Sequence, residues 1–301
     1  MPNIYPTIYF DGQFVPEDQA TLHVASSAVL YGLSVYTVFH VAVHGEQYLA
    51  FRLKDHFKRL VDSCRIIGID TFSQEWSYET FEADMKQLLH VNKPDKNVFV
   101  RASLHVNEKL PGTRSRGLKT SLSAFVYDAE AIVPTSGARL KTSVWRRTPD
   151  FSIPSRAKVN GAYVNSVLAR QDAIDSGYDD CILLDTSGHV AELSAANIFI
   201  VRGGTLITPD TNTDILEGIN RRTVIELANN LSIPVAQRPI DLTELYIADE
   251  VFITGTSAFL TPVTIIDART IETPEHGVTS KLSGAYYNAL KSPDSPYLTV
   301  L

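Results

Sequence analysis

The first third of the chain alternates between apolar and polar residues with a period of two, which predicts strands paired as hairpins. Residues 7–15 read TIYFDGQFV, and Asp11-Gly12 at their centre predicts a tight turn because Gly accepts a positive φ. Residues 34–51 predict a second hairpin that turns at His44-Gly45. With the helices described next, this part of the chain is expected to be α+β.

A helix is predicted over residues 53–67, where apolar residues recur at three- and four-residue steps and form one buried stripe. Arg52, His56 and Arg59 lie off that stripe. The other elements expected in this part are a helix over 78–91 and strands over 97–106 and 119–127.

Residues 128–137 combine turn residues with little periodicity, which indicates a linker between domains. We expect a small N-terminal α/β domain over 1–127 and a larger C-terminal domain over 138–301, because single cores stop growing at about 250–300 residues. The predicted fold class is α/β, as an α+β two-domain protein. The C-terminal elements expected are a strand over 139–145, a helix over 161–177, three strands within 180–209, a helix over 220–231 and a strand into a turn over 248–263.

The composition argues against several classes of protein. A formal net charge of −7 does not suit a surface that coats nucleic acid. The two cysteines cannot build a disulfide framework, and no zinc-ligand spacing occurs, so no metal site is expected. No apolar run reaches the roughly 18 residues of a membrane span, and the start lacks a signal-peptide pattern. We expect a cytoplasmic protein with neither a membrane nor a nucleic-acid partner.

Four common catalytic signatures are missing from the sequence. It contains no G-x-G-x-x-G after a strand, no G-x-x-x-x-G-K-[ST], no H-E-x-x-H and no G-x-S-x-G. Nicotinamide dehydrogenase, P-loop NTPase, zinc protease and α/β-hydrolase hypotheses therefore lack support.

Lys158 stands out because it lies between a Pro/Ser turn and the predicted helix over 161–177. The apolar residues of that helix fall on one side, at Val164, Val167, Leu168 and Ile174, and the helix is expected to end at Gly177. A lysine there is commonly a solvated helix-start residue. A positive charge at a helix N-terminus opposes the macrodipole, however, and local positive potential favours the neutral amine that Schiff-base chemistry requires.

Glu192 lies between Ala191 and Leu193, ahead of an all-apolar strand. One interpretation is an exposed carboxylate at a strand edge. The other is a buried acid, which must be paired because burial of a lone charge is costly.

Two further segments could bind an anion. In ILEGINRRT, at 215–223, a Gly precedes a helix whose first amides are available. In TGTSAFLTP, at 254–262, hydroxyls and small residues follow a strand. Either segment alone is weak evidence.

Together, these four features in this order resemble the class IV, or fold-type-IV, pyridoxal-phosphate (PLP) enzymes, and the likeness runs from LYGLSVYTVF to SAFLTPV. The family includes branched-chain aminotransferases, D-amino-acid aminotransferases, (R)-selective amine transaminases and aminodeoxychorismate lyases. The resemblance implies a D-amino-acid-aminotransferase-like fold, PLP as cofactor, and a homodimer with the pocket between its two domains.

The resemblance assigns roles around the cofactor ring. Lys158 matches the lysine that forms the Schiff base with PLP, and Tyr163 matches the tyrosine near the phenolic oxygen. Glu192 matches the carboxylate that pairs with the pyridine nitrogen, and Leu216 matches the residue that packs on the ring face.

The resemblance also assigns the phosphate contacts. Arg59 matches the arginine of the family's His-x-x-Arg segment. Ile219 and Asn220 match residues whose backbone amides hold the phosphate, and Thr256 adds a hydroxyl. An arginine and a helix start are what a phosphate dianion requires.

The expected substrate residues depart from the branched-chain pattern. Phe99 replaces a tyrosine whose hydroxyl helps bind the substrate carboxylate, and Val38 replaces a glycine and narrows the pocket. Tyr36-x-Val38 is similar to the (R)-amine transaminase pattern. Arg101 is either a structural ion-pair residue or a pocket residue.

Further substrate contacts are expected at Tyr31 and at Ser257 and Ala258 of the 254–262 loop. Arg114 and Arg116 lie on a Gly/Pro-rich loop and either bind a keto-acid carboxylate or remain solvated.

The leading hypothesis is a transaminase that moves an amino group between a small chiral amine or amino acid and a keto acid such as pyruvate, with (R)-amine or D-type selectivity. The alternatives are a branched-chain aminotransferase, an aminodeoxychorismate-type lyase, and a non-catalytic binding protein on the same scaffold.

Overall fold

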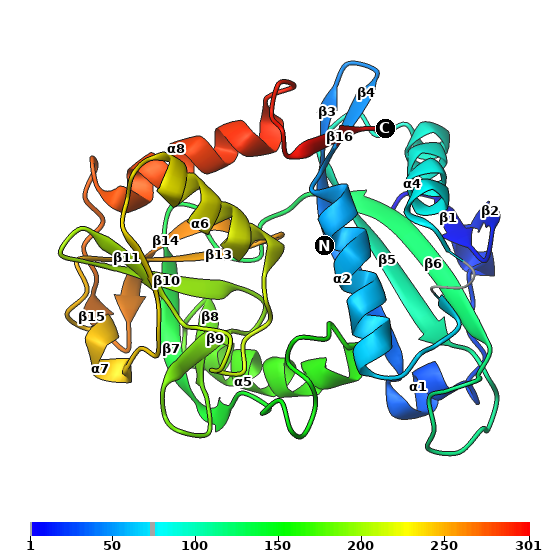
Figure 1. Ribbon diagram of the computed structural model, residues 1–301, viewed down its shortest axis with the longest axis horizontal. Helices are drawn as coiled ribbons and strands as arrows, with labels where there is room; N and C mark the ends of the chain where they lie inside the picture. Colours follow the sequence, from blue (N-terminus) through cyan, green and yellow to red (C-terminus); the bar gives the residue numbers. More distant parts are fainter. Residues whose placement is uncertain (1, 73–75) are drawn as a thin grey trace. The chain divides into compact units, whose positions relative to one another are not determined.

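The computed structural model describes residues 2–72 and 76–301, and these form two compact units (Figure 1). Unit 1 comprises Met1–Glu130, Ala157–Ala162 and Ala289–Leu301, and unit 2 comprises Ala131–Arg156 and Tyr163–Asn288.

Two segments of the expected C-terminal range, 138–301, therefore pack with unit 1. Backbone pairing explains both of them. The final strand, β16 (Leu298–Val300), pairs with β4 (Gln47–Phe51), and an isolated bridge joins Val159 to Val35.

Unit 1 is built on a seven-stranded sheet with the order β16-β4-β3-β5-β6-β1-β2, and every neighbouring pair is antiparallel. Its remaining strands are β1 (Thr7–Phe10), β2 (Gln13–Pro16), β3 (Ser34–His44), β5 (Val98–Val106) and β6 (Thr120–Asp128). Its helices are η1 (Glu17–Gln19), α1 (Ser27–Tyr31), α2 (Leu53–Ile66), α4 (Tyr78–Asn92) and η2 (Asn160–Ala162).

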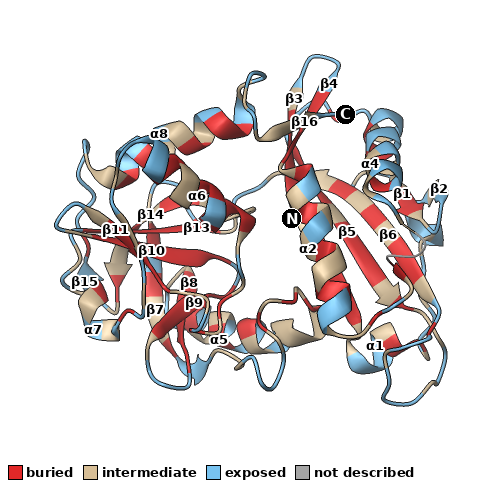
Figure 2. Ribbon diagram, viewed as in Figure 1, coloured by how far each residue is buried: buried red, intermediate tan, exposed pale blue. Residues whose placement is uncertain are grey.

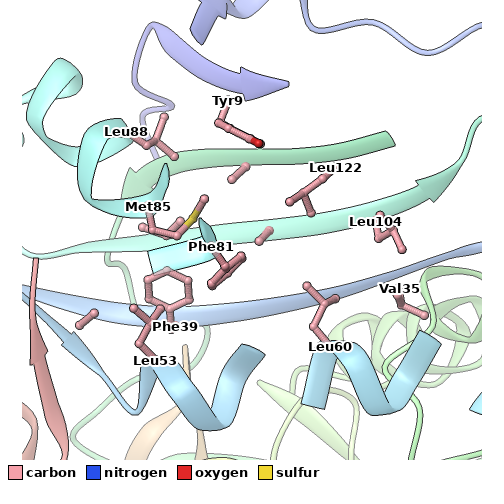
Figure 3. Close-up of a cluster of buried hydrophobic side chains, with 14 of the residues drawn as sticks. Tyr9, Val35, Phe39, Leu53, Leu60, Phe81, Met85, Leu88, Leu104 and Leu122 are labelled. Atoms are coloured by element: carbon pink, nitrogen blue, oxygen red, sulfur yellow. The ribbon is translucent and has the colours of Figure 1, made fainter. Parts of the chain in front are cut away.

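The core of unit 1 forms where α2 and α4 pack on this sheet (Figure 3). Leu53 and Leu60 of α2 and Phe81 and Met85 of α4 pack in one cluster with Phe39 of β3. All five side chains are fully buried, and β3 is buried along most of its length (Figure 2). The sheet therefore provides a rigid surface for side chains on its other face.

Both predicted hairpins are confirmed. Asp11 and Gly12 have φ values of 48° and 80° and connect β1 to β2. In the second hairpin His44 pairs with Gln47, so the turn residues are 45 and 46, one position later than predicted.

The predicted helix over 53–67 is α2, but one of its residues lies in a different environment from the one expected. His56, which lies off the apolar stripe in the sequence pattern, is buried. Its Nδ1 lies 2.7 Å from Oγ1 of Thr37 on β3, so hydrogen bonding rather than hydrophobicity allows its burial.

Unit 2 is built on a nine-stranded mixed sheet with the order β12-β11-β10-β13-β14-β7-β8-β9, and β15 pairs with β14. Its strands are β7 (Ala138–Arg146), β8 (Asp180–Leu184), β9 (Val190–Leu193), β10 (Asn197–Arg202), β11 (Thr205–Thr208), β12 (Val235–Gln237), β13 (Glu250–Gly255), β14 (Phe259–Ile266) and β15 (Arg269–Thr270). Its helices are α5 (Tyr163–Asp175), α6 (Ile219–Asn230), α7 (Leu242–Leu245) and α8 (Val278–Lys291), the last of which ends in unit 1.

Unit 2 differs from expectation in its number of strands. Four strands, not three, occupy 180–209, because the chain turns between β9 and β10 at residues 194–196. In α5 the predicted apolar residues share one side of the helix, as expected, and this side is exposed: Val164 and Val167 are 64% and 63% exposed, whereas Ala169 and Ala173 are buried against β8. Small residues let the helix approach the sheet, and the larger apolar residues are left on the outer face.

Among the described residues, we find no helix with both the length and the apolar character that a membrane crossing requires.

The burial of His40 on β3 predicts a pH dependence of stability. Burial, reinforced by Lys291, lowers the pKa of His40 to about 4 in the folded chain, against 6.5 when unfolded. The unfolded chain binds more protons between these values, so stability falls as the pH drops from 7 toward 4, by about 2 kcal/mol at pH 5. His40→Gln should lose about 2 kcal/mol less than wild type between pH 7 and pH 5 in urea unfolding. Equal losses in the two proteins would contradict this assignment.

Candidate active site

The backbone of Lys158 is fixed inside unit 1 by its neighbours on β3 and α2. Tyr36 donates its backbone N–H to the Lys158 carbonyl at 3.0 Å, and Lys158 donates its own to Oγ of Ser63 at 3.1 Å. The helix α5 begins only at Tyr163, five residues later. Lys158 is therefore placed by strand-like pairing rather than by a helix start, and the macrodipole expected from the sequence is not what positions it.

The Lys158 side chain lies against the ring of Tyr36, with Nζ 4.8 Å from the ring centroid. The guanidinium carbon of Arg101 lies 3.7 Å from the same centroid. Each contact has the geometry of a cation–π interaction, which contributes about 0.5–2 kcal/mol. One buried tyrosine thus holds an amine and a guanidinium near each other.

Arg101 is further oriented by Asn160, two residues after Lys158. Its Nη2 donates to Oδ1 of Asn160 at 2.5 Å, and Nδ2 of Asn160 donates to Oγ of Ser34 at 2.7 Å. A half-buried guanidinium held in this way suits a bound carboxylate, because little side-chain entropy remains to be lost.

Arg59 lies on α2, one turn before Ser63. Its Nη2 is 3.5 Å from Oγ1 of Thr37, the hydroxyl that also contacts His56. Ser63 Oγ donates to the Arg59 carbonyl at 2.8 Å and accepts the Lys158 amide. Ser63 therefore links the backbone of the candidate phosphate arginine to the backbone of the candidate catalytic lysine.

In unit 2, Glu192 is buried, which excludes the exposed-edge interpretation. Its Oε1 accepts a hydrogen bond from Nε of Arg147 at 2.8 Å, and the two side chains are 9% and 11% exposed. Its Oε2 accepts from Nδ2 of Asn197 at 3.0 Å and from the backbone N–H of Leu216 at 3.1 Å. Three chain segments thus hold one carboxylate in a fixed direction.

The start of α6 offers an anion site inside unit 2. Gly218 is the N-cap, with no side-chain capping bond, and Ile219 and Asn220 follow it. A Cβ at Gly218 would overlap Oδ1 of Asn197, so any other residue there would displace the Asn197 side chain. The absent cap leaves first-turn amides for an external acceptor such as phosphate.

Thr256, Ser257 and Ala258 form the turn between β13 and β14. The Ser257 carbonyl accepts from the Ile132 amide at 3.0 Å, and the Ala258 carbonyl accepts from Oγ1 of Thr261 at 2.7 Å. The turn is therefore well defined, with Thr256 half-buried within it. Leu216 and Tyr163 are also half-buried, the latter as the first residue of α5.

The expected substrate residues of β3 and β5 lie on one face of the unit 1 sheet. Val38 lies directly opposite Arg101, and His40 lies opposite Phe99. Phe99 is fully buried, with its ring 5.9 Å from His40 and 5.6 Å from Tyr127. This face of the sheet thus presents the apolar side chains of Val38 and Phe99 together with the guanidinium of Arg101.

Three other expected substrate residues are exposed. Tyr31, at the end of α1, is 49% exposed, and Arg114 and Arg116 are exposed in the loop between β5 and β6. Unit 1 by itself does not gather them around Lys158.

Four further residues, none of them among the candidates from the sequence, contact the predicted site residues. Arg147, Asn197, Asn160 and Ser63 each orient a predicted residue through one hydrogen bond. Only Asn160, two positions from Lys158, carried a sequence signal; the other contacts depend on tertiary packing.

Within residues 2–72 and 76–301, no group of three or more His, Cys, Asp or Glu side chains is arranged to hold a metal ion.

The sequence is similar to those of known proteins over nearly its whole length. Residues 34–266 match the family model of amino-transferase class IV. A probable branched-chain-amino-acid aminotransferase of Aquifex aeolicus (strain VF5) is 37% identical over 295 residues, covering 96% of this chain and 94% of its own.

Solved structures agree. The branched-chain aminotransferase of Thermoproteus uzoniensis, crystallised with norvaline, superposes with a TM-score of 0.93 at 33% identity, covering 99% of each chain. The branched-chain amino acid aminotransferase of Thermobaculum terrenum in its PLP-bound holo-form superposes with a TM-score of 0.88 at 27% identity, covering 99% of this chain and 98% of its own.

The match runs through both units and includes the segments that carry Lys158, Glu192 and the start of α6. The predicted fold class, enzyme class and cofactor are thereby confirmed. The chain belongs to the class IV aminotransferases, and it is a PLP-dependent transferase of amino groups.

Proposed function

We propose that Lys158 carries PLP and that residues of each unit serve defined parts of it. In unit 1, Arg59 binds the phosphate. In unit 2, Glu192 pairs with the pyridine nitrogen, and Leu216 packs on the face of the ring. The phosphate is bound by the backbone amides of Ile219 and Asn220 and by the Thr256 hydroxyl. Tyr163 lies near the phenolic oxygen. The family resemblance supports this assignment, and the geometry within each unit supports its own part.

The donor set fits the chemistry of PLP. A buried carboxylate is the partner that a protonated ring nitrogen requires, and uncapped amides with a half-buried arginine are the partners of a phosphate dianion. When bound, PLP supplies the electron sink for cleavage of bonds to the substrate carbon. Nζ of Lys158, once released from the cofactor, would serve as the base that moves the proton.

We propose that the substrates are branched-chain amino acids and their keto acids. The names of the relatives favour this alternative over the (R)-amine hypothesis that the sequence analysis placed first. The observation that carries the proposal is the guanidinium of Arg101, held by Tyr36 and Asn160 beside Lys158. An α-carboxylate gains a charged partner there, whereas a simple amine does not.

A second candidate function, (R)-amine transamination, is favoured by Val38 and by the buried, hydroxyl-free ring of Phe99. A missing hydrogen bond to a charged group costs roughly 1.5–3 kcal/mol, so carboxylate recognition weakens unless Arg101 compensates. The two candidate functions therefore differ in how strongly Arg101 binds the substrate carboxylate.

We also propose that the protein acts as a homodimer and that the outer face of α5 lies in the interface. Val164, Val167 and Leu168 follow helical spacing and are 64%, 63% and 42% exposed. An apolar face of this kind on a surface helix is typical of an interface, and a second copy is the partner that we assign to it. The cytoplasmic location stays a prediction.

Removal of the Lys158 side chain tests the cofactor assignment. Lys158→Ala should lose the covalent attachment, so borohydride reduction and peptide mapping should find no labelled lysine. Transamination should fall by at least about 100-fold, because base catalysis contributes that much or more. The exposed Lys86→Ala is the matched control and should keep both properties. Label on another lysine in the wild-type protein would contradict the assignment.

The first half-reaction tests the substrate class. Wild type should react faster with L-leucine than with (R)-1-phenylethylamine, as followed by the cofactor absorbance. Arg101→Gln should reduce the rate constant for leucine about 10- to 100-fold, the loss expected for one charged hydrogen bond, and should change the rate for the amine little. The amine, which has no carboxylate, is thus the internal control. A faster reaction with the amine in wild type would favour the second candidate.

A charge on the α5 face tests the homodimer. Val167→Glu should shift the mass measured by size-exclusion chromatography with light scattering from dimer toward monomer, because the interface would bury an unpaired carboxylate. Ile247→Glu, at a residue of unit 2 that is also 64% exposed, should leave the mass unchanged. A dimeric Val167→Glu variant or a monomeric wild type would exclude this interface.

A further inference from the structure

Arg147 is a cation with a largely buried side chain, and the proposed function assigns no role to it. It follows the end of β7, and its backbone N–H donates to the Leu184 carbonyl on β8 at 2.8 Å, so its position depends on the sheet of unit 2. Its side chain is 11% exposed and its Nε lies 2.8 Å from Glu192.

Burial of two charges costs several kcal/mol of desolvation per ion, and an apolar pair of similar size is often as stable. A buried ion pair is therefore weak evidence for a role in stability alone. Here the pair includes Glu192, whose carboxylate the proposed function pairs with the pyridine nitrogen of PLP. The charge of Arg147 therefore affects the protonation of that nitrogen.

A carboxylate beside a pyridine nitrogen shares one proton with it. The proton lies either on the nitrogen, as N–H⁺ facing a carboxylate, or on the acid, as neutral N facing O–H. The charge of Arg147 is adjacent to the carboxylate oxygens, so it stabilises the carboxylate anion more than it destabilises the more distant pyridinium. The donors from Asn197 and Leu216 act in the same direction, because both hydrogen bonds favour the charged carboxylate.

We propose that Arg147 is a positioning residue that holds Glu192 as an oriented anion, so that the proton shared by Glu192 and the pyridine nitrogen of PLP resides on the nitrogen. This inference rests on the proposed role of Glu192. By keeping the nitrogen protonated, Arg147 would increase the ability of the PLP ring to accept electrons, because a protonated ring accepts electrons more readily than a neutral one.

Two substitutions separate charge from size. Arg147→Lys keeps a positive charge near Glu192, whereas Arg147→Gln keeps a polar side chain without the charge. Arg202→Gln is the matched control, since Arg202 also pairs with a glutamate of unit 2, Glu244, and has no part in the proposed site.

The experiment reconstitutes each protein with PLP labelled with ¹⁵N in the ring and records the nitrogen chemical shift by NMR. Wild type, Arg147→Lys and Arg202→Gln should give a pyridinium shift, and Arg147→Gln should move toward neutral pyridine. Equilibrium dialysis of PLP and the melting temperature are measured in parallel, so that loss of the cofactor or of the fold is recognised separately from a change of protonation.

The outcomes distinguish this inference from the proposed function. A wild-type nitrogen that is not protonated would contradict the role of Glu192 itself. A protonated wild type with an unchanged Arg147→Gln shift would overturn the role of Arg147 alone. If Arg147→Gln fails to fold, the Arg147→Lys spectrum decides: a neutral nitrogen there overturns the charge argument, and a pyridinium shift supports it.

Discussion

The hydrogen bond from the Tyr36 amide to the Lys158 carbonyl determines where the amine of Lys158 lies. The segment Ala157–Ala162 belongs to unit 1, although the chain on either side of it belongs to unit 2. This pairing to β3, together with the Ser63 hydroxyl of α2, brings Lys158 to the ring of Tyr36. Because β3 is a central strand with α2 packed on it, a rigid sheet supports the proposed catalytic lysine, as a precisely placed group requires.

A second constraint acts in unit 2, where the buried charge of Glu192 must be compensated. Arg147, Asn197 and the Leu216 amide provide donors from three segments, and of these only the segment of Asn197 is close to Glu192 in sequence. Asn197 also packs against Gly218, where a side chain would displace it. The direction of the carboxylate and the open start of α6 are therefore coupled, because the same asparagine contacts both. A change at Asn197 would disturb the proposed contacts to the ring nitrogen and to the phosphate together.

The sequence pattern predicted local structure well where periodicity and burial agree. The Asp11-Gly12 hairpin, α2 and α6 all appear where expected. It predicted α5 and the side shared by its apolar residues, but gave no indication that Val164 and Val167 on that side are exposed. Periodicity identifies an apolar face without saying what covers that face. The pattern was misleading for His56, because its burial depends on a hydroxyl of β3 that the local sequence does not contain.

The sequence by itself determined the enzyme family, the cofactor and the identity of Lys158, Arg59 and Glu192 as candidate residues, because these residue types occur in a family-specific order. Only the tertiary structure decided which neighbours orient them. Arg101 shares the ring of Tyr36 with Lys158, and Arg147 pairs with Glu192, although 65 positions separate Tyr36 from Arg101 and 45 separate Arg147 from Glu192. The physical reason is that strand pairing and charge burial act through space, so the partners of a buried charge are set by sheet register rather than by spacing along the chain.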